Sequence, residues 1–385
     1  MTGLRIGYTC HDRFPSTDTN TQQIFWTLTE MARLGHEVRL HVRALPYGAD
    51  SRDAVAQHYG RGTGLPSTLR LTAALFTIGE SSAAKALFDL AAPASVADAD
   101  LVWTRDPLAL VRAVRGRTPV VFETFRPDFA QADAFRMWRR LTLPYVRGVI
   151  THSRLAADAF VGAGVPAARV LVAHNGYAPE LMEPPLSRDE ARALTGLPTD
   201  APLVVYTGHV GPQKGTEALV ALAAAMPHVR VVIVGVDERA GERAWVEACA
   251  ARAGGRNLVL VPRVGLREVA RYLYAADCLI VPPTGEPLTR YGRTVLPMKL
   301  FSYMAAGRPI AAPDLPDVRE VLEHDRTALL LAPDDVAGAA AHVTALLADA
   351  PRATRLATGA REASQRYTWQ ARAESITQSL QAWLR

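Results

Sequence analysis

The sequence predicts an α/β protein built from two doubly wound parallel β-sheets. Three observations support this prediction. Short apolar and β-branched runs alternate with longer stretches of helical periodicity, which is typical of parallel strands joined by crossover helices. The alternation stops in a proline-rich stretch at 177–202 and then begins again. The 385 residues, 49% of them hydrophobic, provide enough apolar side chains for the cores of two domains.

The first half of the chain contains six predicted strands, which define a Rossmann-like domain over residues 1–176. Between the first two strands, Thr19 to Leu34 is predicted to be a helix that ends at Gly35. The strands are Leu4–Thr9, Glu37–Val42, Leu101–Thr104, Pro119–Thr124, Gly148–Thr151 and Val170–Ala173.

The second half repeats the pattern after a predicted linker at 177–202, and it defines a second Rossmann-like domain over 203–366. The last residues, 367–385, carry apolar side chains at helical spacing and are predicted to form an amphipathic helix. The strands of this half are Leu203–Gly208, Val229–Gly235, Leu258–Pro262, Cys278–Pro283 and Pro309–Ala312, and its helices include Thr216–Ala225, Glu242–Ala253 and Leu266–Ala275.

Composition excludes several classes of protein. The three cysteines, Cys10, Cys249 and Cys278, are far apart and odd in number, so neither a disulfide framework nor a zinc site is indicated. The 43 Lys+Arg and 38 Asp+Glu residues leave a net charge of +5 without a basic run, which argues against nucleic-acid binding. Without a signal peptide or a run of roughly 18 apolar residues, we expect a cytoplasmic protein.

The first candidate site is the loop GHVGPQKG, from Gly208 to Gly215, which follows a strand and precedes a helix. Its glycines allow a ligand to approach the backbone, the helix N-terminus offers free N–H groups, and Lys214 adds a positive charge. The loop could therefore hold a phosphate or diphosphate. An ordinary βα turn with a solvated lysine explains the loop equally well, because its spacing matches neither a Walker A motif nor GxGxxG.

The second candidate site is the start of a predicted helix in PMKLFSYMAAGRPI, from Pro297 to Ile310. Pro297 suits the first turn of a helix, and the N–H groups of Met298 and Lys299 are then free to bind an anion. The same helix packs Leu300 and neighbouring apolar residues into a core, so site and core are expected on opposite faces.

These motifs together resemble the retaining, nucleotide-sugar-dependent glycosyltransferases of the GT-B fold, of the family-four type. The resemblance covers nearly the whole chain and is most specific in the second half. It rests on YTGHVGPQKG, PMKLFSYMAAGRPI, DLPDVREVL, ALLLAPDD and AADCLIVPP in that half, and on RLGHEVRLHV, VITHSRLAADAF and VLVAHNGY in the first half.

The resemblance implies two Rossmann-like domains that face one another across a cleft, with a C-terminal helix that crosses back to the first domain. The second domain would bind a nucleotide-diphospho-sugar as co-substrate, and the first domain would bind the acceptor. It implies no further cofactor and no metal. The residues that it assigns to the donor are Gly208, Lys214, Arg263, Val264, Met298, Lys299 and Ser302.

The sequence departs from the family pattern on the donor side. His209 stands where the family commonly has an arginine after the glycine of the first donor loop, and it is only partly charged at neutral pH. Thr294 and Ser302 stand where the family has two glutamates, the second of which grips the nucleotide ribose. Ser302 can make one hydrogen bond to a hydroxyl but cannot hold both ribose hydroxyls at once.

The first domain departs from the pattern after the strand that ends at Thr124. Phe125 stands where the family often has an active-site histidine, and Glu123 and Asp128 are alternative candidates there. The catalytic residues implied are therefore Lys214, His209 and Glu123.

Polar residues near the first strand are candidates for acceptor binding. His11 and Asp12 follow that strand, and Asn20 opens the next helix. Together with Phe125 and Asp128 they form the predicted acceptor site, although a solvated loop with Asn20 as a helix N-cap explains the first three equally well. Arginines interleaved with apolar residues at 135–147 could also contact an anionic membrane surface at its inner face, but a solvated helix face is the more ordinary explanation.

The sequence therefore predicts a metal-independent glycosyltransferase that moves a sugar from a nucleotide-diphosphate donor to a hydroxyl of a small-molecule or glycan acceptor, with retention of configuration. Two alternatives remain. The three departures are also compatible with a non-catalytic binding or scaffold protein of the same fold. A phosphorylase or epimerase could use the same diphosphate loops for another reaction.

Overall fold

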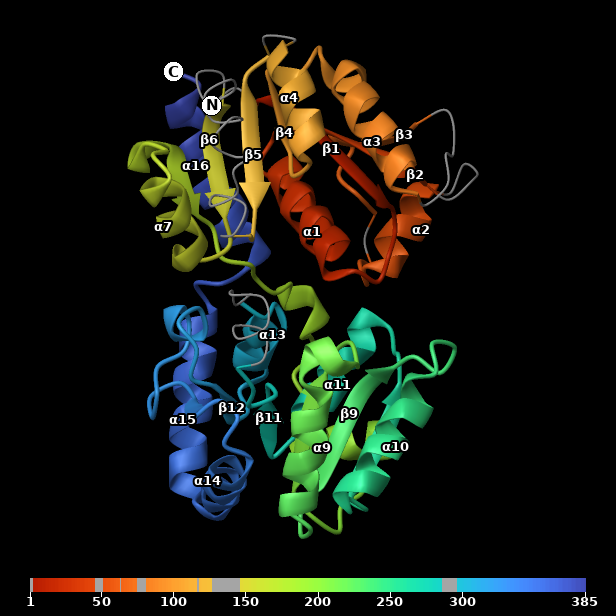
Figure 1. Ribbon diagram of the computed structural model, residues 1–385, viewed down its shortest axis with the longest axis vertical. Coiled ribbons are helices and arrows are strands. Elements are labelled where there is room, and N and C mark those ends of the chain that lie inside the picture. Colours follow the sequence, from red (N-terminus) through yellow and green to blue (C-terminus); the bar gives the residue numbers. More distant parts are fainter. Residues whose placement is uncertain are drawn as a thin grey trace. The chain divides into compact units, whose positions relative to one another are not determined.

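The computed structural model describes residues 3–45, 51–62, 64–74, 81–115, 118–126, 146–285 and 296–385. The chain divides into two compact units (Figure 1). Unit 1 consists of Met1–Asn175 together with Trp369–Arg385, and unit 2 consists of Gly176–Thr368. Each unit is built around one parallel sheet, so the α/β class predicted from the sequence is confirmed.

The sheet of unit 1 has seven strands in the order β3-β2-β1-β4-β5-β6-β7. All of its neighbouring strands are parallel, and the central ones are buried along their length, as expected for a sheet covered by helices on both faces. Its strands are β1 (Arg5–Arg13), β2 (Glu37–Ala44), β3 (Leu69–Ala73), β4 (Leu101–Thr104), β5 (Val120–Thr124), β6 (Val146–Thr151) and β7 (Val170–Val172).

Helices connect these strands, and serine caps fix the start of two of them. Ser81 Oγ accepts a hydrogen bond from the Ala84 N–H, and Ser153 Oγ accepts one from the Ala156 N–H, both at 3.2 Å. The helices of unit 1 are α1 (Thr19–Arg33), α2 (Ser51–His58), α3 (Ser82–Ala91), α4 (Pro107–Arg115), α7 (Arg154–Gly162) and α16 (Trp369–Trp383), with 3₁₀ turns η1 (Ala92–Val96) and η2 (Ala167–Arg169).

The C-terminal helix α16 belongs to unit 1 although it follows unit 2 in the sequence (Figure 1). Its apolar positions Ala373, Ile376 and Leu380 are fully buried, and it packs against α1. At its end the Trp383 indole N–H donates to the Ala168 carbonyl at 2.9 Å. The predicted return of the chain to the first domain is therefore confirmed.

The sheet of unit 2 has six parallel strands in the order β10-β9-β8-β11-β12-β13. Apolar side chains on its two faces form two large clusters of buried residues. The β-branched character of β8 and β9 explains this, because both faces of these central strands are packed by helices. The strands are β8 (Leu203–Thr207), β9 (Arg230–Val236), β10 (Leu258–Pro262), β11 (Cys278–Ile280), β12 (Ile310–Pro313) and β13 (Leu329–Leu331).

The helices of unit 2 include one in the segment predicted as a linker. Residues 177–202 form η3 and α8, and a capping box between Ser187 and Glu190 starts that helix. Ala191 and Leu197 are buried in the unit 2 core, so the structure includes this segment in unit 2. The helices are α8 (Arg188–Thr195), α9 (Thr216–Ala225), α10 (Glu242–Ala253), α11 (Leu266–Ala275), α13 (Lys299–Ala306), α14 (Val336–Ala348) and α15 (Ala350–Ser364), with 3₁₀ turns η3 (Pro179–Leu181), η4 (Pro212–Lys214) and η5 (Val318–Glu320).

Two strands, β3 and β13, were not among the predicted ones. Both are short strands at an edge of their sheet, where length and periodicity give a weak signal. The arginine-rich segment at 135–147 lies mostly outside the described residues. Among the described residues, no helix has both the length and the apolar composition needed to cross a membrane.

Gly148 on β6 provides a test of how closely α16 packs. A β-carbon on Gly148 would overlap the indole ring of Trp383, whereas a β-carbon on Gly162 would meet nothing within 4 Å. We expect Gly148→Ala to lower the free energy of unfolding by about 1–3 kcal/mol through overpacking. Gly162→Ala, the matched control, should change it by less than about 1 kcal/mol. Equal stability of both variants in urea denaturation would contradict this packing.

Candidate functional site

The chain leaves β8 at Gly208, which adopts a backbone conformation that favours glycine. Gly208 has φ +133°, and its N–H donates to the Val234 carbonyl at 2.9 Å. A β-carbon at this position would lie 2.8 Å from the Nζ of Lys299. The missing side chain therefore leaves room for an ammonium group beside the exposed backbone of the loop.

Lys299 places that ammonium group at the carboxyl end of β8. Its Nζ lies 3.6 Å from the centre of the Tyr206 ring, which provides a favourable cation–π contact. Burial lowers the pKa of Lys299 well below its ordinary value, and the charge of Lys214 lowers it further. Among the described residues, no carboxylate forms an ion pair with it. The part of the site that the structure describes therefore provides no carboxylate partner for this lysine.

Lys214 is the second cation of this loop. It is the last residue of η4 and is exposed. Gly215 follows in the left-handed conformation with φ +70°, and a β-carbon there would lie 2.7 Å from Pro282 Cβ. Thr216 Oγ1 accepts a hydrogen bond from the Gly211 N–H at 3.0 Å. These contacts fix the path of the loop and hold Lys214 near Lys299.

Lysine is rare in this chain, which makes its position informative. Only Lys85, Lys214 and Lys299 are lysines among the 43 Lys+Arg residues. Two of the three therefore lie at this one loop. Lysine offers a compact point charge with an adjustable pKa, whereas arginine is always charged and broader.

His209 and Arg263 extend the positive edge of the site. The Tyr206 hydroxyl donates to the His209 carbonyl at 2.6 Å. The Arg263 Nη2 lies 3.5 Å from His209 Nδ1 and 3.6 Å from an oxygen of Asp237. Arg263 therefore supplies a permanent charge beside the histidine, while Val264 packs half-buried against the unit 2 core.

Helix α13 carries the remaining predicted donor residues. Met298 precedes its first residue. The Leu300 N–H donates to the Pro297 carbonyl at 3.1 Å and the Phe301 N–H donates to the Met298 carbonyl at 3.3 Å, so the N–H groups of Met298 and Lys299 are the ones that no preceding helical turn satisfies. The Tyr303 hydroxyl accepts from the Thr207 N–H at 2.8 Å and ties the helix to β8. Tyr303 is fully buried and Ser302 is half-buried, as expected if the core and the site lie on different faces of the helix. Thr294 lies outside the described residues.

In unit 1, Glu123 is a buried carboxylate and not an accessible catalytic group. It is 1% exposed. Its Oε1 accepts from Gln23 Nε2 and His152 Nε2, each at 3.0 Å, and also pairs with Arg105 at 3.0 Å. The Tyr8 hydroxyl lies 3.3 Å from Oε2.

Arg372 on α16 completes this cluster. Its Nη2 donates to Glu123 Oε1 at 2.5 Å and its Nε donates to Thr27 Oγ1 at 3.1 Å. Burial lowers the pKa of Arg372 to about 10, with Glu123 opposing this shift. Burial alone would raise the pKa of Glu123, but Arg105, His152 and Arg372 hold it well below its ordinary value.

The predicted catalytic role of Glu123 is therefore corrected to a structural one. A buried carboxylate that already pairs with two guanidinium groups and accepts hydrogen bonds from Gln23 and His152 has no free position for a substrate. His152 does not replace it as an acid or base: burial lowers the pKa of His152 to about 4, so the ring stays neutral at physiological pH.

The structure brings His11 together with two aspartates that the sequence did not single out. His11 Nδ1 lies 3.1 Å from an oxygen of Asp89 on α3 and 3.1 Å from an oxygen of Asp106. Asp106 is the second residue after β4 and could have been found, because polar residues at the carboxyl ends of parallel strands often form sites. Asp89 lies inside an apolar helix, and only the fold reveals its position.

The other predicted acceptor residues lie near two groups of side chains: His11 with Asp89 and Asp106, and Glu123 with its buried partners. Asn20 Nδ2 donates to Asp12 Oδ2 at 2.8 Å, while Arg105 donates to the side-chain Oδ1 of Asn20. Phe125 is half-buried, with its ring centre 6.1 Å from that of His152. Asp128 lies outside the described residues.

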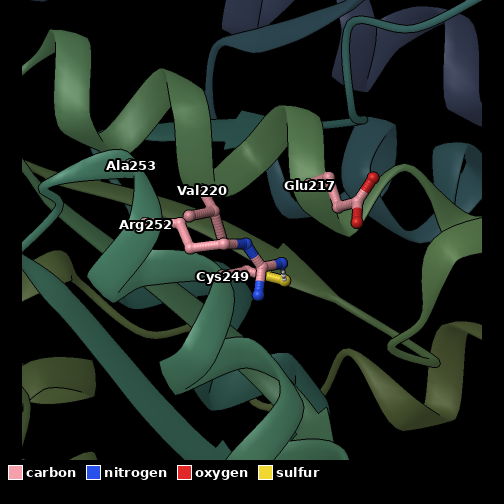
Figure 2. A pocket seen from close by; sticks show the side chains of 5 residues that line it. All are labelled: Glu217, Val220, Cys249, Arg252 and Ala253. Atoms are coloured by element: carbon pink, nitrogen blue, oxygen red, sulfur yellow. Dashed lines mark hydrogen bonds between the residues drawn. The ribbon is translucent and has the colours of Figure 1, made fainter.

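A separate surface pocket of about 280 Å³ lies between α9 and α10. Figure 2 shows the side chains that line it, including Arg252, whose Nη2 lies 3.1 Å from Cys249 Sγ. None of the predicted donor residues lines it. Its lining consists of Glu217, Val220, Cys249, Arg252 and Ala253.

Two family models match the chain, one in each half. "Glycosyltransferase Family 4" matches residues 21–181, and "Glycosyl transferases group 1" matches residues 201–349. The chain belongs to the family-four glycosyltransferases. The resemblance found in the sequence is therefore confirmed. The loop from Gly208 to Gly215 and helix α13 both lie within the second matched region.

Relatives of this glycosyltransferase include two proteins named D-inositol 3-phosphate glycosyltransferase. The one from Xylanimonas cellulosilytica is 34% identical over 196 residues, which cover 50% of this chain and 45% of the relative. The one from Stackebrandtia nassauensis is 30% identical over 220 residues, covering 54% and 47%. The chain thus spans about half the length of these relatives.

Solved structures support the same fold. HepE from Anabaena, in complex with UDP and glucose, aligns with a TM-score of 0.72 and 17% identity over 98% of this chain and 100% of that one. Sucrose-phosphate synthase from Thermosynechococcus elongatus aligns with a TM-score of 0.77 and 20% identity over 98% of both chains. Both likenesses establish the GT-B fold of this glycosyltransferase.

The structural role of Glu123 can be tested by removing its charge. We expect Glu123→Gln to lower the free energy of unfolding by about 3–5 kcal/mol, because it leaves Arg105 and Arg372 buried without a counter-charge. Asp100→Asn, which breaks the exposed pair with Arg5, should have little effect. If Glu123→Gln were as stable as the parent in chemical denaturation but inactive, the catalytic role predicted from the sequence would be restored.

Proposed function

We propose that the chain transfers a sugar from a nucleotide-diphospho-sugar to a hydroxyl group of a small-molecule or glycan acceptor, with retention of configuration. The observation that carries this proposal is the pair of lysines at the carboxyl end of β8. Lys299 is held beside an aromatic ring and a second lysine with no carboxylate of the described residues paired to it. A diphosphate supplies the charge that such a pair is missing.

The chemistry of glycosyl transfer explains why positive charge is needed there. The bond between the anomeric carbon and the diphosphate breaks as the sugar acquires oxocarbenium character, and negative charge grows on the departing phosphate oxygen. Fixed cations stabilise this charge more in the transition state than in the bound donor. Lys214 and Lys299 would neutralise the diphosphate, with Arg263, His209 and the first N–H groups of α13 around them.

The donor and acceptor follow from different observations. The HepE structures contain UDP or UDP-glucose, which makes uridine donors the first to test in a screen that also includes GDP-, ADP- and dTDP-sugars. In unit 1 the carboxylates of Asp12, Asp89 and Asp106 would repel a phosphate beside His11. We therefore propose that the acceptor bound there is an uncharged molecule with a hydroxyl group. The inositol phosphate in the names of the relatives is not proposed as the acceptor of this chain.

A non-catalytic binding protein is the alternative. It is favoured by Thr294 and Ser302, which stand where the family has glutamates, because Ser302 can form fewer hydrogen bonds to the ribose hydroxyls than a glutamate. Release of a nucleoside diphosphate that requires an acceptor would exclude this alternative. The anomeric configuration of the product, followed by proton NMR, tests the expected retention. Interconversion of the donor sugar without an acceptor would instead indicate an epimerase.

The lysine pair gives the first test of the donor site. We expect Lys214→Ala to lower kcat/KM at least tenfold without unfolding, because a hydrogen bond to a charged group contributes about 1.5–3 kcal/mol. Lys299→Met should weaken nucleoside diphosphate binding, measured by isothermal titration calorimetry, by a similar factor. Lys85→Ala removes the remaining lysine and serves as the matched control. Unchanged kinetics of a folded Lys214→Ala variant would remove this lysine from the site.

Ser302 gives a test of nucleotide specificity. A carboxylate that accepts from both ribose hydroxyls discriminates strongly against deoxyribose, since a lost partner costs about 1–3 kcal/mol. We expect less than about tenfold discrimination between UDP and dUDP, or the pair with the preferred base, in competition binding. Ser302→Glu should increase it. A hundredfold preference of the parent chain for the ribonucleotide would show that another residue holds the ribose.

A further inference from the structure

Three elements of unit 1 bring His11, Asp89 and Asp106 together. His11 lies near the end of β1, Asp89 lies in the last turn of α3, and Asp106 is the second residue after β4. The Asp106 N–H donates to Thr104 Oγ1 at 3.1 Å, which fixes the chain as it leaves β4. One atom from each of the three side chains lies within 4.8 Å of the other two. Residues far apart in the sequence therefore form a single polar cluster.

The ring nitrogen Nδ1 of His11 faces two buried carboxylates. It lies 3.1 and 3.2 Å from the two oxygens of Asp89, and 3.1 Å from Oδ1 of Asp106. The side chains of these aspartates are 6% and 9% exposed. Since Nδ1 carries at most one hydrogen atom, a single N–H group is shared by two carboxylates.

Asp106 Oδ1 is the atom that this sharing leaves without a donor. Nδ1 forms its hydrogen bond with Asp89. Asp106 Oδ2 accepts from the His11 backbone N–H at 3.3 Å, but among the described residues no N–H or O–H group forms a hydrogen bond with Oδ1. Leaving a buried carboxylate oxygen without a donor costs free energy. Its direction, toward Nδ1, indicates a positive group between the ring and the aspartates.

The second ring nitrogen provides an independent indication of what this group is. Asp12 Oδ1 lies 3.9 Å from Nε2 of His11, and Asp12 Oδ2 accepts from Asn20 Nδ2 at 2.8 Å. Histidines that bind a metal through one nitrogen usually direct the N–H of the other at a carboxylate. The 3.9 Å separation is longer than a hydrogen bond, yet it places negative charge on the side of the ring that carries the proton when Nδ1 binds an ion.

We propose that His11, Asp89 and Asp106 bind a divalent transition-metal ion, with Asp12 as the carboxylate behind the histidine. Nδ1 and one oxygen from each aspartate supply three ligands, and water can complete the shell because the His11 side chain is 27% exposed. Ligand atoms at about 2.0–2.2 Å from one ion, with angles of about 90–110°, are about 2.8–3.6 Å apart. The distances from Nδ1 to Asp89 and to Asp106, both 3.1 Å, fall within this range.

Charge favours a divalent ion at this position. Two ionised carboxylates are balanced by a divalent ion, whereas an imidazolium leaves one negative charge of the buried pair without a counter-charge. A mixed set of imidazole and carboxylate suits Mn²⁺, Fe²⁺ or Zn²⁺, while Mg²⁺ and Ca²⁺ prefer oxygen ligands. With its charge balanced, the ion adds no excess positive charge for a phosphate, which agrees with the uncharged acceptor proposed above.

The proposed role of the ion is structural. All of its ligands belong to unit 1, so the proposal does not rest on the proposed glycosyl transfer, and the transfer itself is still expected to be independent of metal. An ion at this position would connect β1, α3 and the segment after β4. It would stabilise the folded chain, because the unfolded chain lacks the assembled site.

A proton held between the ring and the carboxylates is the competing explanation. Burial raises the pKa of Asp106 to about 7, opposed by His11 and assisted by Asp89 and Asp12, so a proton can take the central position without an ion. The two explanations differ in whether the purified chain binds a metal ion at these three side chains.

The first experiment measures metal binding by the full chain after treatment with EDTA. Mn²⁺ and Zn²⁺ are titrated by isothermal titration calorimetry, and Mn²⁺ is the more selective probe because the free thiols of Cys10, Cys249 and Cys278 could bind zinc. We expect one Mn²⁺ per chain with a dissociation constant below about 100 μM, and tighter binding of Zn²⁺. Weaker binding of both ions would overturn the proposal in favour of the shared proton.

The second experiment removes single ligands. His11→Gln and Asp89→Asn are compared with His58→Gln and Asp98→Asn, which change exposed residues of the same types in unit 1. We expect each ligand variant to bind Mn²⁺ at least about tenfold more weakly than the parent, and each control to remain within twofold. A loss of less than tenfold in both folded ligand variants would place the ion elsewhere and overturn the assignment.

Two measurements on the parent chain decide the question if the ligand variants do not fold. Saturating Mn²⁺ should raise the Tm of the EDTA-treated chain, because only the folded chain has the site. Pulsed electron paramagnetic resonance of the bound Mn²⁺ should detect one directly coordinated nitrogen, that of His11. An unchanged Tm, or bound Mn²⁺ without a coordinated nitrogen, would overturn the proposal.

Discussion

The buried carboxylate of Glu123 is the interaction on which the rest of unit 1 depends. It forms ion pairs with Arg105 from the loop after β4 and with Arg372 from α16, and it accepts hydrogen bonds from α1 and from the residue after β6. Isolated buried charges are costly, so each of these groups requires the others. Since Arg372 lies 249 residues after Glu123, the core of unit 1 is complete only when the last helix of the chain is in place.

This cluster also fixes the polar groups nearer the surface. Arg105 donates to Asn20, Asn20 donates to Asp12, and Asp12 lies beside His11. A chain of hydrogen bonds thus connects a buried charge to the half-exposed end of β1. The polar residues at this end of β1 are therefore held in place by hydrogen bonds that lead back to the buried cluster around Glu123.

Elements that depend on residues close together in the chain could be predicted from the sequence. The central strands and the helices α9, α10 and α11 were correct because apolar periodicity and capping residues specify them locally. The loop from Gly208 to Gly215 could be recognised as a candidate site because its glycines and its lysine are close together in the chain. The partners of Glu123, and the grouping of Asp89 with His11, were not predicted because these residues are distant in sequence. A short helical piece was expected among the prolines of 177–202, and α8 lies there, but its packing into the unit 2 core through Ala191 and Leu197 was not predicted.

The buried positive charges of the two units differ in their partners. Arg105 and Arg372 of unit 1 face a carboxylate, whereas Lys299 of unit 2 faces a second lysine. In unit 1 the buried guanidinium groups of Arg105 and Arg372 share the carboxylate of Glu123, which belongs to the same unit, so this ion pairing contributes to folding. In unit 2, Lys214 in the loop after β8 and Lys299 on α13 repel one another, and burial further disfavours the charge of Lys299. The cation–π contact with Tyr206 offsets part of this cost, but among the described residues no carboxylate pairs with Lys299. An anion bound beside Gly208 would supply a counter-charge for this lysine, and this argument supports the proposed donor site more directly than the sheet that carries it.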